Sequence, residues 1–206
     1  MLATMSGPTS DFWQAKFESN VTPWDRGDAS PQLRQWLSSK VLTTCRIVVP
    51  GCGSGYEVAV LARSGFDVTG IDYAPAAIAR TRSAVAAANA SADVIEADVL
   101  TFTPGTLFDA VYEQTCLCAL HPDRWVPYAR RLHAWLRSGG SLFALFAQVA
   151  RPDAATGSIS GPPYHCDINA MRALFDGTRW QWPEPPYERV LHPAGFAELA
   201  VVLVRT

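Results

Sequence analysis

Short apolar runs alternate with helical patterns through the middle of the chain. The run at 45–49 is rich in β-branched residues and lacks polar alternation, which predicts a strand buried on both faces. Further strands are predicted at 67–72, 93–97, 108–113 and 141–149, and helices at 57–63, 75–89 and 123–137. Gly139 and Gly140 are expected to end the last helix. Because strands separated by helices pair in parallel through right-handed crossovers, this order predicts a doubly wound α/β sheet.

Both ends of the chain depart from this alternation. Ser30 followed by Pro31 predicts the start of a helix. Beyond a loop at 159–164 and a helix at 167–175, apolar runs at 180–192 and 198–205 predict an antiparallel strand pair at the sheet edge. Pro183, Pro185 and Pro186 make the first of these strands irregular. The fold class is therefore α/β: a mostly parallel seven-stranded sheet with helices on both faces and an antiparallel carboxyl-terminal pair. We expect one domain over residues 1–206.

The composition narrows the class of protein. With 206 residues, 49% hydrophobic residues and seven tryptophans, the chain has ample material for a folded core and is not disordered. No apolar run is long enough to span a membrane, and residues 1–13 lack the pattern of a secretory signal. A formal charge of -2 argues against a nucleic-acid partner. Five cysteines without a disulfide framework predict free thiols in a cytoplasmic protein.

A glycine-rich turn follows the first predicted strand. The sequence there is Val49-Pro50-Gly51-Cys52-Gly53-Ser54-Gly55, and its alternate glycines let the backbone turn tightly and approach a ligand closely. Asp72 ends the second strand, where its carboxylate would meet the two hydroxyls of a ribose. The alternatives are a tight turn that binds nothing and a carboxylate that caps the following helix. Together, the glycines and Asp72 favour a nucleoside ligand at the carboxyl edge of the sheet.

The glycine spacing separates two nucleoside cofactors. Dinucleotide-binding folds need the pattern G-x-G-x-x-G, but Tyr56 and Val58 stand where its last glycine would fall. Asp98 follows the third strand, where it could accept a hydrogen bond from the amino group of an adenine. Glycines and acids at the tips of three successive strands fit S-adenosylmethionine (SAM) better than NAD. An NAD-linked dehydrogenase is therefore the weaker alternative.

Several motifs resemble those of one enzyme family. They are Trp13-x3-Phe17, Thr22-Pro23-Trp24-Asp25-x-Gly27, the turn at 49–55 with its Val-Pro start, Phe108-Asp109-Ala110-Val111-Tyr112, Cys118-Ala119-Leu120, Arg124-x3-Tyr128 and Gly161-Pro162-Pro163-Tyr164. With them the chain is similar, from Phe12 to its carboxyl terminus, to class I SAM-dependent methyltransferases of the thiopurine and thiol/halide methyltransferase family. The resemblance implies a Rossmann-like fold, SAM as the cofactor, S-adenosylhomocysteine (SAH) as its product, and methyl transfer to the sulfur of a small-molecule thiol.

The resemblance also gives a role to the amino-terminal aromatic residues. In plant relatives that methylate halides and thiocyanate, three aromatics with this spacing help to enclose SAM. The matching residues here are Trp13, Phe17 and Trp24, with Phe17 replacing a tryptophan, and Gln114 replaces a family tyrosine. The segment 12–27 has no clear amphipathic pattern, so we expect residues 1–40 to form a lid or helical extension. The alternative is that these rings are permanently buried core.

The residues expected to contact the cofactor belong to the arm, the glycine turn and the strand tips. They are Trp13, Phe17, Trp24, Gly51, Cys52, Gly53, Asp72, Asp98, Val99, Glu113 and Gln114. Tyr164 and Trp24 are expected to contact the acceptor. No residue is assigned as a certain catalytic group, because methyl transfer to a thiolate requires mainly positioning and a dry pocket.

Other chemistries remain open from the sequence. His121 or His165 would be the base for a hydroxyl or amine acceptor. Cys116-x-Cys118-x2-His121 has no second ligand pair at metal-binding spacing, so no metal is expected. The acceptor could also be a thiopurine, a halide or thiocyanate, a selenium or tellurium species, or a hydroxyl of a secondary metabolite. A SAM-binding module without catalysis is a further alternative, and both a monomer and a homodimer stay open.

Overall fold

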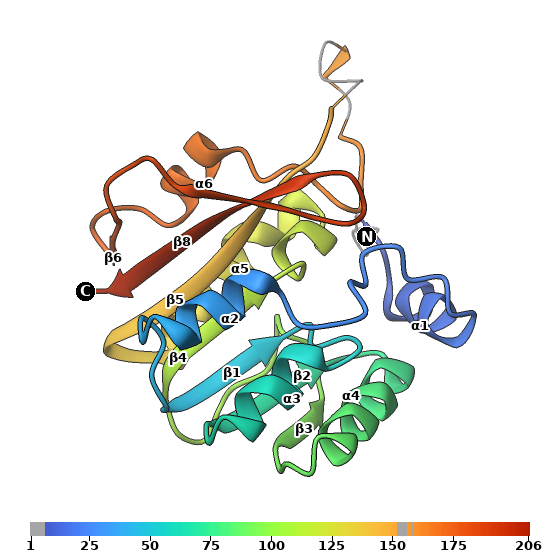
Figure 1. Cartoon of the computed structure of the whole chain (residues 1–206). Helices are drawn as coiled ribbons and strands as arrows, with labels where there is room; N and C mark the ends of the chain where they lie inside the picture. The colour runs from blue at the N-terminus through green and yellow to red at the C-terminus, as the bar shows by residue number, and fades with distance from the viewer. Residues whose placement is uncertain (1–6, 152–155, 158) are drawn as a thin grey trace.

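A computed structural model describes residues 7–151, 156–157 and 159–206 (Figure 1). The helices are α1 (Ser10–Glu18), α2 (Pro31–Ser38), α3 (Tyr56–Arg63), α4 (Pro75–Ala87), α5 (Trp125–Trp135) and α6 (Ile168–Leu174), with short 3₁₀ helices η1 (Leu117–Ala119) and η2 (Pro122–Arg124). The strands are β1 (Arg46–Pro50), β2 (Asp67–Asp72), β3 (Asp93–Glu96), β4 (Phe108–Gln114), β5 (Leu136–Gln148), β6 (Trp180–Gln181), β7 (Glu188–Leu191) and β8 (Ala197–Arg205). None of the described helices is long and apolar enough to cross a membrane.

The strands form one sheet in the order β3-β2-β1-β4-β5-β8-β6. β1 pairs in parallel with both β2 and β4. The chain continues from β2 to β3 on one side and from β4 to β5 on the other, and all of these pairs are parallel. The strand order therefore reverses between β1 and β4. In an open α/β sheet, ligands bind in the crevice above the carboxyl ends of two such strands.

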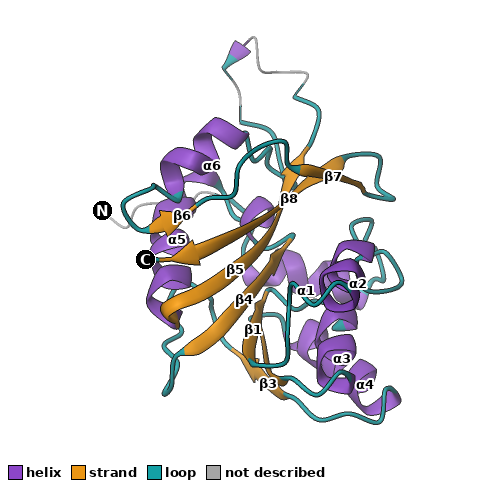
Figure 2. Cartoon of the chain, turned by 60° about the vertical axis from the view of Figure 1, so that its left-hand side comes forward, coloured by secondary structure: helices purple, strands orange, loops and turns teal. Residues whose placement is uncertain are grey.

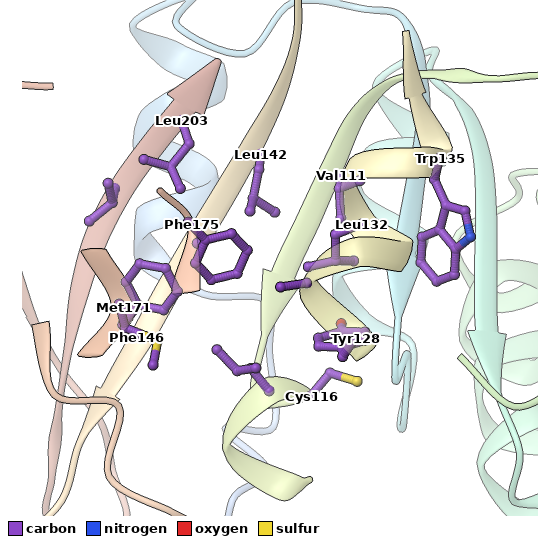
Figure 3. Packing of buried hydrophobic residues seen from close by; sticks show 14 of the residues in the cluster. Val111, Cys116, Tyr128, Leu132, Trp135, Leu142, Phe146, Met171, Phe175 and Leu203 are labelled. Carbon is purple, nitrogen blue, oxygen red and sulfur yellow. The ribbon is translucent and has the colours of Figure 1, made fainter. Parts of the chain in front are cut away.

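Helices cover both faces of the sheet (Figure 2). On one face, Trp36 of α2 packs edge-on against Phe143 and Tyr112, at ring-centroid distances of 5.2 and 6.2 Å. On the other face, Leu132 of α5 is fully buried beside Val111 of β4, as Figure 3 shows. Each face has its own core of buried hydrophobic residues. The predicted doubly wound class is confirmed.

Two short strands share the seventh position of the sheet. β6 pairs with Val204 and Arg205 at the end of β8, whereas β7 pairs with residues 197–200 at its beginning. The sequence predicted one irregular strand over 180–192. The prolines within that range separate two pieces instead, because a proline cannot donate to the strand ladder. β8 runs antiparallel to β5, as expected.

The start of β5 corrects a predicted boundary. The sequence predicted that Gly139 and Gly140 end a helix over 123–137, but α5 ends at residue 135 and both glycines lie inside β5. Gly139 has a φ angle of +73°, and a Cβ on Gly140 would lie 3.0 Å from the Asp109 carbonyl oxygen. The pairing of β4 with β5 is irregular at this place. The two glycines therefore accommodate a bulge between strands rather than a helix end.

A helix that hydrophobic periodicity did not reveal occupies part of the amino-terminal arm. Phe17 is the buried residue of α1. The helix docks on α4 through apolar and polar contacts: Phe17 shares a small buried cluster with Ala77, the Gln14 Oε1 accepts a hydrogen bond from the Ala76 N–H at 2.9 Å, and Arg80 donates to the Phe17 carbonyl oxygen. A helix with one buried side chain leaves no apolar stripe in the sequence, so hydrophobic periodicity could not place α1 within the expected lid or helical extension.

Gly55 provides a test of the close packing between α3 and α4. It has a φ angle of +78°, and a Cβ there would lie 2.5 Å from the Thr81 Cα. We expect Gly55→Ala to lower the free energy of unfolding by about 2 kcal/mol or more, because backbone strain and overpacking add. Urea unfolding followed by circular dichroism measures the change. Gly105→Ala is the control, since a Cβ at Gly105 meets nothing within 4 Å; equal stabilities of the two variants would contradict the expectation.

Candidate active site

The turn between β1 and α3 holds its three glycines in left-handed conformations. The φ angles of Gly51, Gly53 and Gly55 are +61°, +52° and +78°. A Cβ on Gly51 would lie 2.9 Å from the Cβ of Cys116, which follows β4. The glycines are therefore required both by the backbone conformation and by the close approach of the loop after β4. As a result, backbone groups of the turn face the crevice between β1 and β4.

Asp72 fastens this turn to the second strand. Its Oδ2 accepts a hydrogen bond from the Gly53 N–H at 3.0 Å, and its Oδ1 accepts one from the Ala74 N–H at 3.0 Å. The side chain is buried, and burial raises its pKa while the two backbone donors lower it. The helix-capping alternative is wrong: the N-cap residue of α4 is Ala74, which has no side-chain capping hydrogen bond, so Asp72 bonds the backbone just before the helix. Each oxygen still has a second lone pair that a ligand hydroxyl could use.

These groups line a cavity of ≈ 670 Å³ at the carboxyl edge of the sheet. Most of the residues expected to bind the cofactor line it: Trp13, Phe17, Trp24, Gly51, Cys52, Gly53, Asp72, Asp98, Val99 and Gln114. Its volume falls in the range of pockets that bind cofactors and other small molecules. The loop after β3 supplies an apolar side chain, Val99, next to Asp98, whose Oδ1 accepts the Leu100 N–H at 2.8 Å.

Three aromatic rings cover one side of the cavity. Trp24 packs edge-to-face against Trp13 and Phe17, at centroid distances of 5.2 and 5.9 Å. The residue after Trp24 ties this cover to the glycine turn, because Asp25 Oδ2 accepts a hydrogen bond from the Ser54 hydroxyl at 2.5 Å. The aromatic arm therefore lies against the turn rather than apart from it.

Two residues expected at the site, Glu113 and Tyr164, do not line the cavity. Glu113 is buried, and its Oε1 accepts a hydrogen bond from the Leu117 N–H at 2.6 Å, so it supports the loop after β4. Burial raises its pKa to about 7. Successive residues of a strand point to opposite faces, and of the neighbouring pair only Gln114 reaches the cavity. Instead of Tyr164, its neighbours Gly161, Pro162 and Pro163 form the wall.

A buried ion pair stands beside Gln114. The Arg26 Nη2 lies 2.8 Å from the Glu198 Oε2, and the two side chains are 10% and 0% exposed. The Gln114 amide donates to both Glu198 oxygens at 3.1 Å and accepts a hydrogen bond from the Tyr112 hydroxyl at 2.7 Å. Arg26 and Glu198 are 172 positions apart, so no local motif marked them. The one available signal was a glutamate inside the apolar run at 198–205.

Neither histidine that the sequence offered as a base lines the cavity. The His121 Nδ1 accepts a hydrogen bond from the Asp123 N–H at 3.3 Å, and its ring meets the edge of Tyr164 at 5.4 Å. His165 lies next to Tyr164 in the chain, and burial lowers its pKa. Both rings therefore stand behind the cavity wall.

His192 does line the cavity, although no sequence motif singled it out. Its ring stacks on Phe196 at a centroid distance of 4.2 Å. The Nδ1 accepts a hydrogen bond from the Ala194 N–H at 3.1 Å, which assigns the proton of the neutral ring to Nε2. Burial, and then the nearby Arg26, lower its pKa to about 4. His192 is therefore neutral at physiological pH and poorly suited to hold an acceptor's proton.

The cysteines at the cavity are free thiols. Cys52, Cys116 and Cys118 are among the lining residues. Burial raises the pKa of Cys52 to about 12 and raises the pKa of Cys116 and Cys118 well above the usual thiol range. In the part of the chain that the structure describes, no group of three or more His, Cys, Asp or Glu side chains is arranged to hold a metal ion.

Comparison with known proteins identifies the family. The profile of the Thiopurine S-methyltransferase (TPMT) family matches residues 8–206. The chain belongs to this family. It is 30% identical to Probable thiol methyltransferase 2 of Arabidopsis thaliana, over 96% of this chain and 79% of the relative. It is 27% identical to Thiocyanate methyltransferase 1 of the same plant, over 92% of this chain and 74% of the relative.

Solved structures show the same fold. The 1,6-didemethyltoxoflavin-N1-methyltransferase of Burkholderia thailandensis, solved with SAH, superimposes with a TM-score of 0.73 at 17% identity, covering 96% of this chain and 87% of the other. Magnesium protoporphyrin IX methyltransferase from Synechocystis, also solved with SAH, gives a TM-score of 0.69 at 14% identity, covering 94% and 83%. The TPMT-family chain is a SAM-dependent methyltransferase with the class I fold, so the predicted enzyme class and cofactor are confirmed. The NAD alternative is set aside.

Asp72 is the residue at which cofactor binding is best tested. We expect Asp72→Asn to weaken SAH binding by about tenfold or more, because hydrogen bonds to a charged acceptor contribute about 1.5–3 kcal/mol. The amide oxygen can still accept one backbone N–H, so the variant should fold. Calorimetry measures the affinity. Asp67→Asn, at the exposed start of the same strand, is the matched control and should bind SAH as the wild type does. Wild-type SAH affinity in a folded Asp72→Asn protein would contradict the role of Asp72 in cofactor binding.

Proposed function

We propose that this methyltransferase transfers the methyl group of SAM to the sulfur of a small thiol. The observation that carries the proposal is the character of the wall next to Gln114. Its lining residues are mostly apolar: Cys118, Ala119, Leu120, Pro162, Pro163 and Phe196. The nearest carboxylate, Glu198, is ion-paired, and the lining imidazole, His192, holds its Nδ1 lone pair in a backbone hydrogen bond. A thiol suits such a wall because it ionises near neutral pH and needs little help from a base.

The lining residues at the carboxyl ends of β1, β2 and β3 fit the cofactor. SAM, when bound, supplies an electrophilic methyl group on a sulfonium. We assign Asp72 to the ribose hydroxyls, since each of its oxygens keeps a free lone pair, and Asp98 with Val99 to the adenine. Gly51 and Gly53 let the backbone approach the ligand, where a side chain would fill the space. These are the placements that the strand tips of this fold favour.

The proposed work of the protein is positioning and exclusion of water. Gln114 is held from both ends, by Tyr112 and by Glu198, so its amide keeps one orientation at the tip of β4. Trp13, Phe17 and Trp24 cover the cavity, and an aromatic ring near a sulfonium would add an attraction of about 0.5–2 kcal/mol. A dry, ordered pocket of this kind strips water from the attacking sulfur.

The relatives support a sulfur acceptor without fixing which one. Their names include a thiol, a thiocyanate and a thiopurine methyltransferase. Thiopurines, halides or thiocyanate, selenium or tellurium species and hydroxyl groups are the alternative acceptors. A panel of these compounds, assayed with labelled SAM, separates them and also separates an enzyme from a binding module.

The pH dependence of turnover tests the thiol proposal. If the thiolate is the nucleophile, kcat/KM should rise with pH toward the thiol pKa of about 8.5 and follow the thiolate fraction of each substrate. Steady-state rates with thiols of widely different pKa measure this. A flat profile across those thiols would argue against attack by the free thiolate.

The two histidines behind the wall supply a second test of the same chemistry. We expect His121→Gln and His165→Gln to keep wild-type kcat within about twofold, because neither ring lines the cavity. SAH affinity measured in parallel controls for folding of the site. Loss of turnover in either variant, with SAH binding intact, would reveal a protein base and favour a hydroxyl or amine acceptor.

We also propose that the arm from Phe12 to Gly27 is a lid that orders over the cofactor. Limited digestion with trypsin should cut at Lys16 in the free protein, and SAH should protect this site by closing the arm. Arg179, in the exposed turn before β6, is the internal control and should be cut alike in both states. Equal resistance with and without SAH, together with a large stability loss in Trp24→Ala, would mean that the arm is permanent core.

A further inference from the structure

The cationic side chains at the cavity are few. Among the described residues that line it, Lys16 and Arg26 are the basic ones, and His192 is neutral. Lys16 belongs to α1, on the side of the arm, where its ammonium lies 5.6 Å from the centre of the Phe12 ring. Arg26 lies beside the wall next to Gln114, since its guanidinium and the Gln114 amide both contact Glu198. Arg26 is thus the cation available to the acceptor half of the cavity.

This arginine is already neutralised. Its Nη2 lies 2.8 Å from Glu198, whose side chain is fully buried. Gln114 donates to both oxygens of the same carboxylate, so the pair is fixed within a chain of hydrogen bonds that ends at Tyr112. Turning Arg26 toward another anion would leave Glu198 buried without a counter-charge, which is strongly unfavourable. The pair therefore presents no free positive charge to a bound acceptor.

The remaining charge at this wall is negative or absent. Glu57 lines the cavity, and its carboxylate accepts a hydrogen bond from the Ser30 N–H at 2.9 Å, but no described cationic group lies within ion-pair distance of it. A neutral Glu57 still leaves Arg26 matched by Glu198. The surface around them is apolar, with Leu120, Pro162 and Phe196.

We propose that the acceptor pocket selects thiols whose carbon skeleton carries no negative charge, and that Glu198 sets this selectivity by holding Arg26. The inference rests on the thiol methylation proposed above. A carboxylate on the acceptor would lose its water without gaining a cation, whereas an uncharged skeleton loses little by contact with the apolar wall. Glu198 is therefore a specificity-determining residue that acts through Arg26 and does not touch the substrate.

A matched pair of substrates tests the selectivity in the wild-type protein. Mercaptopropionamide and mercaptopropionate have similar size and differ in the charge of the group distant from sulfur. With concentrations corrected for the thiolate fraction, we expect kcat/KM for the amide to exceed that for the carboxylate by about tenfold or more. Similar values, or a preference for the carboxylate, would overturn the proposal.

Glu198→Gln tests the assigned residue. The amide keeps a hydrogen-bonding side chain beside Gln114 but frees the charge of Arg26, so the preference for mercaptopropionamide should fall by about tenfold, mainly through a lower KM for mercaptopropionate. Glu188→Gln, at an exposed acid on the adjacent β7, is the matched control and should keep the wild-type preference. An unchanged preference in folded Glu198→Gln would overturn the role of Glu198.

A double variant and a binding measurement provide two further tests of the selectivity. If Glu198→Gln does not fold, the double variant Arg26→Gln/Glu198→Gln removes both charges; it should still reject mercaptopropionate, and acceptance would contradict the proposal. Calorimetry of the two thiols with SAH-loaded wild-type protein measures the selectivity without turnover. If neither thiol is methylated but the amide binds more tightly, only the thiol function fails. If both are methylated and bound alike, only the selectivity fails.

Discussion

The buried carboxylate of Asp72 is the contact on which the site depends. It joins the glycine turn after β1 to the start of α4, through one hydrogen bond to Gly53 and one to Ala74. A carboxylate at this depth is costly to bury unless its oxygens are bonded, and the two backbone donors meet that need. This junction holds the glycine turn next to the start of α4, the helix on which α1 docks. A protein group thus organises the pocket before any ligand contributes.

A second buried network links parts of the chain that are remote in sequence. Arg26 belongs to the segment after the aromatic arm, Glu198 to the last strand, and Gln114 to the tip of β4. Their hydrogen bonds therefore tie the base of the proposed lid to the wall that an acceptor would meet. Because the hydrogen bonds of such a network strengthen one another, a substitution at one end alters the hydrogen bonds at the other. The proposed cofactor cover and the proposed acceptor wall therefore share one hydrogen-bond network.

Much of the fold, but less of the site, could be predicted from the sequence. The β-branched run at 45–49 and the repeated strand–helix alternation predicted the sheet, and the glycines with Asp72 predicted the position of the crevice. Local pattern failed where distant contacts decide the outcome: α1 buries a single side chain, and Arg26 and Glu198 lie 172 positions apart. Along β4, a run of buried residues gave no alternation from which to tell that Gln114 faces the cavity while Glu113 lies behind it.

The cysteines of the cavity have a consequence for an enzyme that binds a methyl donor. Cys52, Cys116 and Cys118 stand at the walls of a site built for a methyl donor, yet burial keeps the pKa of each thiol far above its usual range. A protonated thiol is a weak nucleophile and exchanges slowly with disulfides. The protein can therefore hold an electrophile beside its own sulfurs without methylating itself, and the proposed thiol substrate would not form mixed disulfides with them. Burial of these side chains thus protects the protein's own thiols from the bound methyl donor.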